Sequence, residues 1–232
     1  MSKKISGAVV LVSGGLDSAT VLAIAKSKFS KVFALTFDYG QRHSREIISA
    51  KRVASSQKAD LHKILKIDLR SFGSSALTGK IPVPKKRNSR QISSGIPVTY
   101  VPARNTIFLS FALAWSESMR AQNIFIGANA IDYSGYPDCR PEFLHAYQKM
   151  ANVATKVGLN RKTRIKIHAP LLQMTKAQII KKGIKLKVDY SVTFSCYDPH
   201  KGIACGFCDS CILRKKGFVE AGVTDPAMYM KR

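Results

Sequence analysis

An apolar run that stops at a pair of glycines constrains the fold of this chain more than any other feature. Residues 8–12 are apolar and rich in valine, residues 13–18 read Ser-Gly-Gly-Leu-Asp-Ser, and an apolar helical pattern continues over residues 19–25. This order predicts a buried strand, a tight loop and the start of a helix. The two glycines allow a sharp turn and a close approach to a ligand, because no Cβ stands in the way.

The loop at residues 13–18 is expected to bind phosphate, because the free N–H groups at a helix start and the positive end of the helix dipole attract anions. The Gly-Lys-Ser/Thr ending of the Walker-type loop is missing. The loop is similar instead to the Ser-Gly-Gly-x-Asp-Ser loop of ATP pyrophosphatases, and this resemblance implies that ATP is split into AMP and pyrophosphate. An ordinary capped turn is the alternative. The expected cofactor-binding residues are Val12, Ser13, Gly14, Gly15, Leu16, Asp17, Ser18, Ala19, Thr20 and, at the end of the next strand, Asp38.

The length of 232 residues and the hydrophobic content of 45% favour one α/β domain over residues 1–232, with a distinct C-terminal segment from about residue 189. No apolar run approaches the roughly 20 residues of a membrane span, so no membrane partner is expected. The first strand begins almost at once, which leaves no room for a signal peptide and predicts a cytoplasmic protein.

The chain is strongly basic, with 38 Lys and Arg against 14 Asp and Glu and a net charge of +24. Such an excess favours binding of nucleic acid, an anionic membrane or anionic small ligands. The basic clusters at residues 80–90, 161–166 and 181–187 contain no aromatic residue, which argues against base stacking. Solvated faces are therefore the simpler interpretation of these charges.

Strand and helix patterns alternate along the chain. Strands are predicted at residues 31–38 and 62–68, with a helix spaced by Ile47 to Ala54 between them. This alternation predicts an α/β fold with a doubly wound, mostly parallel sheet, whose ligands lie beyond the carboxyl ends of the strands. Further on, the patterns predict a buried helix at 107–115, strands at 123–127 and 164–169, and helices at 143–153 and from Lys176.

Residues 71–101 interrupt this alternation with Gly and Pro and little periodicity. A loop of this length inside a compact domain is a lid or a partly disordered insertion. A lid over the ATP and substrate site is the favoured interpretation.

Four of the five cysteines are spaced to hold a metal: Cys196, Cys205, Cys208 and Cys211. Two C-x2-C steps and a fourth thiolate can close a tetrahedral shell around one structural zinc ion. A [4Fe–4S] cluster is the alternative, although the proline that follows the last ferredoxin cysteine is missing here. Disulfides are a poor alternative in a reducing cytoplasm.

A polar segment beyond the fourth predicted strand carries Asp132, Asp138 and Arg140 around a lone Cys139. A carboxylate can accept two hydrogen bonds from the edge of a guanine-like ring, whereas an Asp-rich turn is the structural alternative. Arg104 and Asn105 open a predicted helix, where they could bind an anion or simply be solvated.

These segments together resemble the 7-cyano-7-deazaguanine synthase family of ATP pyrophosphatases. The matching segments span almost the whole chain in family order: residues 12–18, Asp38-Tyr39-Gly40-Gln41-Arg42-His43, Val101-Pro102-Ala103-Arg104-Asn105, Asp132-Tyr133-Ser134-Gly135-Tyr136-Pro137-Asp138-Cys139-Arg140 and the four-cysteine tail. The resemblance implies an adenine nucleotide alpha hydrolase-like fold, conversion of 7-carboxy-7-deazaguanine, ammonia and ATP to the 7-cyano compound, and a homodimer. It does not account for the net charge.

The resemblance also implies roles for particular residues. Loop N–H groups would hold pyrophosphate, Asp17 would help place Mg²⁺, and Asp17, Ser18 and Arg104 are the expected catalytic residues. Lys176 is a weaker candidate for a phosphate contact. The expected substrate residues are Asp132, Tyr133, Ser134, Asp138 and Arg140, with Arg140 or Arg104 facing the substrate carboxylate.

Two other functions remain open at this point. A tRNA-modifying ATP pyrophosphatase would keep the same loop and would explain the positive charge. Against it, the chain has no appended RNA-binding domain, so no stable nucleic-acid partner is expected. A non-catalytic, zinc-stabilised nucleotide sensor would bind ATP without releasing AMP.

Overall fold

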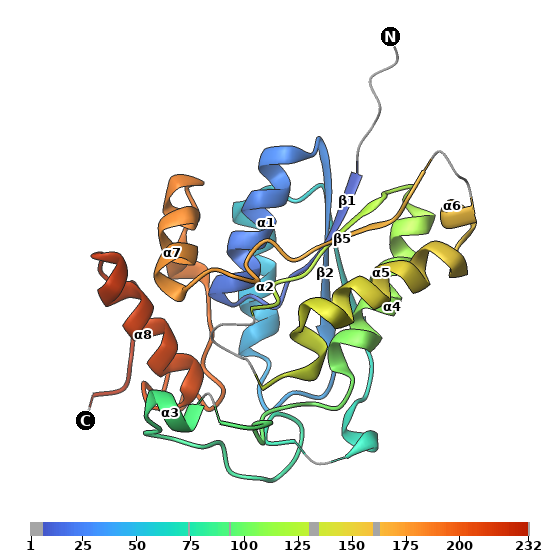
Figure 1. Ribbon diagram of the computed structural model, residues 1–232. Coiled ribbons are helices and arrows are strands. Elements are labelled where there is room, and N and C mark those ends of the chain that lie inside the picture. The colour runs from blue at the N-terminus through green and yellow to red at the C-terminus, as the bar shows by residue number, and fades with distance from the viewer. Residues whose placement is uncertain (1–6, 74, 93, 130–134, 160–162, 232) are drawn as a thin grey trace.

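Five parallel strands form one sheet in the order β3-β2-β1-β4-β5. The computed structural model describes residues 7–73, 75–92, 94–129, 135–159 and 163–231 (Figure 1). The chain starts in the middle of the sheet and winds outward in both directions, so the predicted doubly wound parallel sheet is confirmed. The strands are β1 (Gly7–Leu11), β2 (Lys31–Asp38), β3 (Leu61–Lys66), β4 (Asn123–Phe125) and β5 (Lys166–His168).

The central strand β1 is apolar on both sides because helices cover both faces of the sheet. Ala8, Val9 and Val10 have no exposed surface. Such continuous burial explains why this strand lacks the polar alternation of a half-exposed one. Val9 is in register with Phe33 of β2 and Ile124 of β4, which fixes where the loop after β1 emerges.

Two hydrophobic cores lie on opposite faces of the sheet. One core contains buried residues of α1 (Leu16–Lys28), α2 (Arg45–Ser56) and α7 (Lys176–Lys185). The other contains residues of α4 (Arg104–Ser118) and α5 (Pro141–Ala154). Figure 1 shows these two helix groups on either side of the strands. The remaining elements are η1 (Arg70–Phe72), α3 (Ser89–Ile92), η2 (Pro137–Cys139), α6 (Lys156–Leu159), η3 (Tyr190–Val192) and α8 (Asp209–Ala221).

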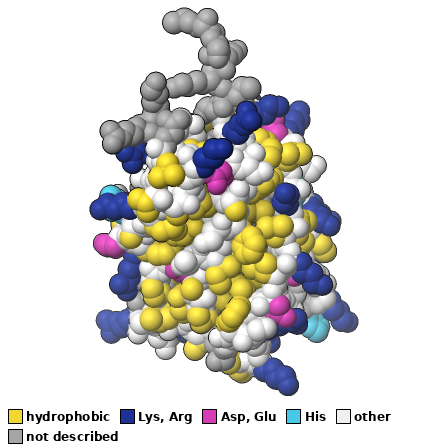
Figure 2. Space-filling view, turned by 90° about the vertical axis from the view of Figure 1, so that its right-hand side faces the viewer, with side chains coloured by type: hydrophobic (Ala, Val, Ile, Leu, Met, Phe, Trp, Pro, Cys, Tyr) yellow, Lys and Arg dark blue, Asp and Glu magenta, His cyan; other side chains and the backbone are white. Residues whose placement is uncertain are grey.

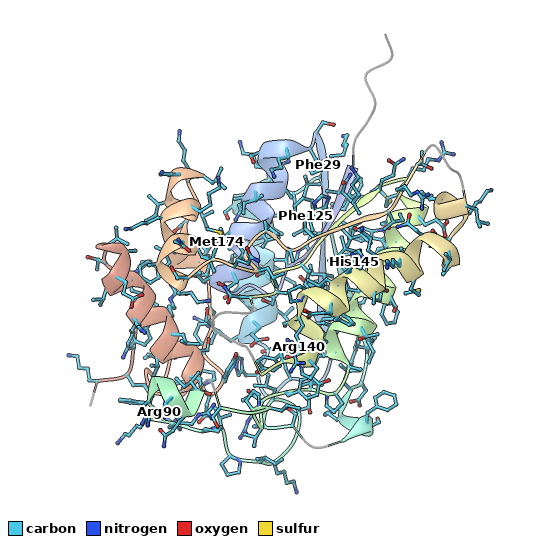
Figure 3. All side chains as sticks on the ribbon, viewed as in Figure 1. Phe29, Arg90, Phe125, Arg140, His145 and Met174 are labelled. Atoms are coloured by element: carbon cyan, nitrogen blue, oxygen red, sulfur yellow. The ribbon has the colours of Figure 1, made fainter. Side chains whose placement is uncertain are left out.

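Aromatic contacts add to the core formed by α1, α2 and α7. The ring of Phe125 in β4 packs edge-on against Phe29 after α1, with 5.6 Å between ring centroids (Figure 3). The Phe125 ring also stacks on His168 of β5, with 4.4 Å between centroids. Such geometries are favourable for aromatic pairs. The contacts therefore fasten α1 to the strands on which the candidate site is built.

The structure differs from the sequence prediction mainly at element ends. The predicted strand at 164–169 shortens to β5, and α4 begins three residues before the predicted helix at 107–115. Helix α8, which starts inside the cysteine tail, was not predicted. Its buried face, which packs against α7, includes polar residues such as Ser210 and Arg214, so the sequence shows no clear apolar face.

The described residues between 71 and 101 are fastened to the cysteine tail. Lys85 forms an isolated bridge with Cys208, and the Lys86 N–H donates to the Phe207 carbonyl oxygen at 2.8 Å. Figure 1 shows α3 beside the start of α8. Leu77 is buried and lines the pocket described below. The stretch thus borders the site, while the motion of a lid stays a prediction.

Among the described residues, no helix is long and apolar enough to cross a membrane.

Candidate functional site

The loop between β1 and α1 is folded tightly against α2. Gly14 has a φ of +82°, and a Cβ at this position would lie 2.5 Å from the Ala50 nitrogen and 2.6 Å from the Glu46 carbonyl oxygen. Only glycine fits this combination of positive φ and close backbone approach. The Gly14 carbonyl oxygen also accepts a hydrogen bond from the Phe194 N–H at 2.8 Å, which joins the loop to the C-terminal segment.

Hydrogen bonds within the loop hold its shape. The Ser18 hydroxyl donates to the Gly15 carbonyl oxygen at 3.0 Å and accepts from the Ser13 N–H at 3.2 Å. Helix α1 begins without a side-chain cap, apart from a long contact of 3.4 Å between the Leu16 N–H and the Ser195 hydroxyl. N–H groups at a helix start that have no strong hydrogen-bond partner can donate to a bound anion.

Asp17 points away from the loop backbone to a lysine on α7. The Lys176 ammonium lies 2.8 Å from both oxygens of the Asp17 carboxylate. Lys176 is 8% exposed, and Thr175 and Gln178 form a capping box that fixes the start of its helix. Lys176, a weaker candidate for phosphate contact, is therefore held beside the loop by the expected catalytic carboxylate.

One pocket brings several of the expected residues together. Its lining includes Ser13 and Leu16 of the loop, Phe37 of β2, and Arg104 and Phe108 of α4. Because parallel strands end on the same edge of the sheet, the loop and these side chains meet beyond their carboxyl ends. The expected residues Val12, Ser13, Gly15, Leu16, Asp17, Ser18 and Arg104 all line this pocket.

Four other expected cofactor residues do not line it. Ala19 and Thr20 are completely buried inside α1, where the Thr20 hydroxyl donates to the Leu16 carbonyl oxygen at 3.0 Å. Gly14 is turned toward α2 and Asp38 lies at the end of β2, both outside the lining. These four residues thus lie around the loop without lining the pocket.

Arg104 brings a positive charge to the pocket. Its guanidinium lies 6.0 Å from the centroid of the Phe108 ring and forms no ion pair with any residue in the described ranges. Burial lowers the pKa of Arg104, but Tyr39, Tyr136 and Asp138 around it outweigh burial and raise that pKa above its ordinary value. The group stays charged and can meet an anionic substrate.

Asp138, which is expected to bind substrate, accepts a hydrogen bond at the start of α4. Its carboxylate accepts the Asn105 N–H at 2.9 Å, and the Asn105 amide donates to the Asp138 carbonyl oxygen and to the Cys139 sulfur. Asp138 is 5% exposed and does not line the pocket. The sequence could not show this contact, because η2 must first fold against the start of α4.

The other expected substrate residues of that segment do not line the pocket or lie outside the described residues. Arg140 is exposed at the N-cap of α5, outside the pocket lining, and Figure 3 shows it beside the start of that helix. Of the two arginines expected to face the substrate carboxylate, Arg104 lines the pocket and Arg140 does not. Cys139 does line the pocket, and burial raises the pKa of its thiol to about 11, which keeps it neutral. Asp132, Tyr133 and Ser134 lie outside the described residues.

Glu46 is a pocket residue that the sequence interpretation missed. It occupies the first turn of α2, where an acidic side chain is usual and gives no functional signal. Burial raises the pKa of the Glu46 carboxyl to about 7, although the charge of Arg104 acts in the opposite direction. The only hint of a functional role in the sequence was that Glu46 follows shortly after the Asp38-to-His43 segment, which resembles the family.

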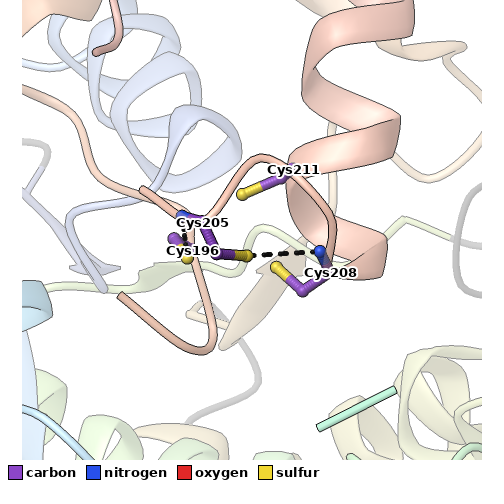
Figure 4. A group of neighbouring side chains, drawn as sticks. All are labelled: Cys196, Cys205, Cys208 and Cys211. Carbon is purple, nitrogen blue, oxygen red and sulfur yellow. Dashed lines mark hydrogen bonds between the residues drawn. The ribbon is translucent and has the colours of Figure 1, made fainter. Parts of the chain in front are cut away.

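The four tail cysteines converge on one point. Their sulfur atoms lie within 4.8 Å of one another, and none of the four residues is more than 3% exposed (Figure 4). Sulfur atoms bound tetrahedrally to zinc at about 2.3 Å would be about 3.8 Å apart, so the group fits a single ion. Backbone N–H groups support the sulfurs: Cys205 donates to Cys196 at 3.2 Å, and Cys208 donates to Cys205 at 3.3 Å.

This cluster positions part of the pocket wall. Ser195 and Tyr197 flank Cys196 and line the pocket, and Ser210 precedes Cys211. Asp209 at the start of α8 pairs with Arg87 of the 71–101 stretch. The metal-binding group thus holds together the tail, that stretch and one side of the pocket.

The fold is similar to that of a solved NMN synthetase from Francisella tularensis. The TM-score is 0.51, with 15% identity, and the match covers 95% of this chain and 79% of that structure. At this identity the likeness concerns the fold alone. The chain is thus an α/β protein with an adenine nucleotide alpha hydrolase-like fold, and it carries a cluster of four cysteines near its C-terminus.

Sequence comparison narrows that class to one family. The profile described as "Queuosine biosynthesis protein QueC" matches residues 7–222. A 7-cyano-7-deazaguanine synthase of Desulfatibacillum aliphaticivorans is 61% identical over 224 residues and covers 96% of each chain. Another, from Citrifermentans bemidjiense, is 60% identical over 232 residues and covers both chains completely. The chain belongs to the QueC family, and the predicted synthase function in queuosine biosynthesis is confirmed.

Proposed function

We propose that this protein converts 7-carboxy-7-deazaguanine, ammonia and ATP into 7-cyano-7-deazaguanine through two adenylated intermediates. One observation carries the proposal: the glycine loop and Arg104 line the same pocket. The loop offers N–H donors for pyrophosphate, and Arg104 offers a charged partner for the carboxylate of the acid. ATP and acid can therefore meet beyond the carboxyl ends of β1 and β2.

Adenylation solves the problem of the leaving group. A carboxylate reacts poorly with ammonia because oxide would have to leave. Transfer of AMP to the carboxylate, with release of pyrophosphate, makes AMP the leaving group, and attack by ammonia then gives the amide. A second adenylation on the amide oxygen allows AMP to leave again and forms the nitrile. Two ATP are thus consumed for each nitrile.

The chain's residues divide this work by position. Loop N–H groups bind the departing pyrophosphate, and the Ser18 hydroxyl keeps the loop in shape through the Gly15 carbonyl oxygen. The Asp17 carboxylate would hold Mg²⁺, and the ion would neutralise phosphate charge there. Arg104 orients the acid for attack on the α-phosphate.

The four cysteines hold one structural zinc ion in this proposal. Their separation suits a closed tetrahedral site, in which no coordination position is left for a substrate. Hydrogen bonds from the thiols of Cys208 and Cys211 and from the Cys205 N–H hold the pKa of Cys196 below its ordinary value. A site of this kind readily binds a cation as thiolate.

The partners are small molecules, and the protein acts as a cytoplasmic homodimer without a stable nucleic-acid partner. Exposed apolar side chains on one face support the dimer. Figure 2 shows hydrophobic bands on the side of the molecule that carries α4 and α5. Phe111, Met150 and Val153 of these helices are 40%, 40% and 74% exposed.

Chromatography of the nucleotide products tests the reaction. We expect AMP and pyrophosphate to appear in a ratio of two to each nitrile, only when the acid is present. ADP and phosphate would contradict the proposal. Turnover on tRNA alone, with binding that weakens as salt rises, would instead support the tRNA-modifying alternative that the charge of +24 suggests.

A further inference from the structure

Glu46 stands out among the acidic residues of the pocket. Within the described residues, Asp17 and Glu46 are the carboxylates that line it. Asp17 is engaged by Lys176, whereas the Glu46 carboxylate forms no hydrogen bond or ion pair with a described residue. The Glu46 side chain is half-buried, so it keeps access to the pocket. The reaction described above gives Glu46 no step.

The backbone places Glu46 between the two halves of the site. Its carbonyl oxygen lies 2.6 Å from where a Cβ of Gly14 would be, so the first turn of α2 touches the phosphate loop. Glu46 also shares the pocket lining with Tyr39 and with Arg104 of α4, and its charge interacts with both of them. If ATP and the acid bind as proposed, Glu46 lines the space in which they meet.

The reaction needs such a group because ammonia is protonated at neutral pH. Ammonium has no lone pair and cannot attack an acyl adenylate. A general base is most effective when its pKa lies near the working pH. Burial raises the pKa of Glu46 to about 7, which suits a group that binds ammonium as a carboxylate and then accepts its proton.

We propose that Glu46 is a catalytic residue that binds ammonium and deprotonates it for attack on the acyl adenylate; this inference rests on the proposed function. One proton passes from ammonium to the Glu46 carboxylate. The nitrogen lone pair forms the C–N bond, and the C–O bond to AMP breaks with its electron pair leaving on the phosphate. The second proton lost by nitrogen goes to the AMP phosphate, and Glu46 returns its proton to solvent.

The test separates adenylation from amide formation. For Glu46→Gln we expect acid-dependent exchange of pyrophosphate into ATP to stay within about threefold of the parent, because this half-reaction uses no ammonium. The kcat/KM for ammonium at neutral pH should fall about 100-fold, the usual size of a general-base effect. At alkaline pH, where neutral ammonia is abundant, the gap should shrink to a few-fold.

Glu142→Gln is the matched control, because Glu142 is also an acid in the first turn of a helix but is exposed on α5. It should leave both measurements unchanged. Unchanged use of ammonium in Glu46→Gln would overturn the proposal. An equal loss of pyrophosphate exchange would also overturn it, and so would a loss of kcat/KM for ammonium that persists at alkaline pH. Either result would indicate a structural or nucleotide-binding role for Glu46. If the unaltered protein shows no exchange with the acid, the proposed function itself fails.

Discussion

The Lys176 ammonium lies 2.8 Å from each carboxylate oxygen of Asp17, although 159 residues separate the two in the chain. This pair joins α7 to the phosphate loop and balances the Asp17 charge in the absence of nucleotide. Mg²⁺ and the phosphates of ATP would offer each partner a new ion of opposite charge. The pair thus keeps two groups of the site in place for ATP.

Replacing Asp17 tests this arrangement. Asp17→Asn keeps an oxygen acceptor for Lys176 but removes the charge that holds Mg²⁺. We expect acid-dependent AMP formation to fall at least about 100-fold, with a loss of unfolding free energy of no more than about 3 kcal/mol. AMP release and thermal unfolding measure the two effects. Near-normal turnover of the folded variant would refute the assigned role.

Gly14→Ala tests the fit of the loop against α2. The new Cβ would meet the Ala50 nitrogen at 2.5 Å at a φ of +82°, so the loop must move and ATP binding should weaken at least tenfold. Gly222→Ala is the matched control: its φ is +74°, but nothing lies within 4 Å of the added atom. Calorimetric titration with ATP compares them, and equal affinities would contradict the account.

Cys208→Ser tests the metal site. Loss of one of four thiolates should reduce bound zinc from one ion per chain to a small fraction and lower the melting temperature, because metal binding contributes to folding. Cys139→Ser should keep its zinc, since Cys139 lies outside the cluster. Elemental analysis of the purified proteins decides this. Iron in place of zinc would establish a cluster instead.

Two substitutions of Asp138 test whether it stabilises the start of α4 or binds substrate. Asp138→Ala removes the acceptor of the Asn105 N–H and should reduce the unfolding free energy by about 1 kcal/mol. Asp138→Asn keeps an acceptor and should retain most of the stability and the KM for the acid. Chemical denaturation and steady-state kinetics measure both. A large rise of that KM in a fully stable Asn variant would return Asp138 to the substrate site.

Features encoded by neighbouring residues could be predicted from the sequence. The apolar run, the two glycines and the next helix start all lie within residues 8–25, and the structure places β1, the loop and α1 there. Cysteine spacing is equally local, and the four sulfurs do converge. In both cases the chemistry of a short stretch determines its own conformation.

Features that depend on distant contacts could not be predicted. The role of Asp138 depends on η2 packing against α4, and the partner of Asp17 comes from a helix near the other end of the chain. Glu46 looks like any acid in a first helical turn until the sheet places it opposite Arg104. Arg140 has the right charge for the substrate carboxylate but lies on the surface.

Tracing nitrogen from ammonium into the nitrile tests most directly whether the protein makes 7-cyano-7-deazaguanine from the free acid. The protein would be incubated with 7-carboxy-7-deazaguanine, ATP, Mg²⁺ and isotopically labelled ammonium, and the products would be weighed by mass spectrometry. We expect a labelled 7-cyano-7-deazaguanine that forms together with AMP. Unchanged acid, or a modified base found only within tRNA, would contradict it.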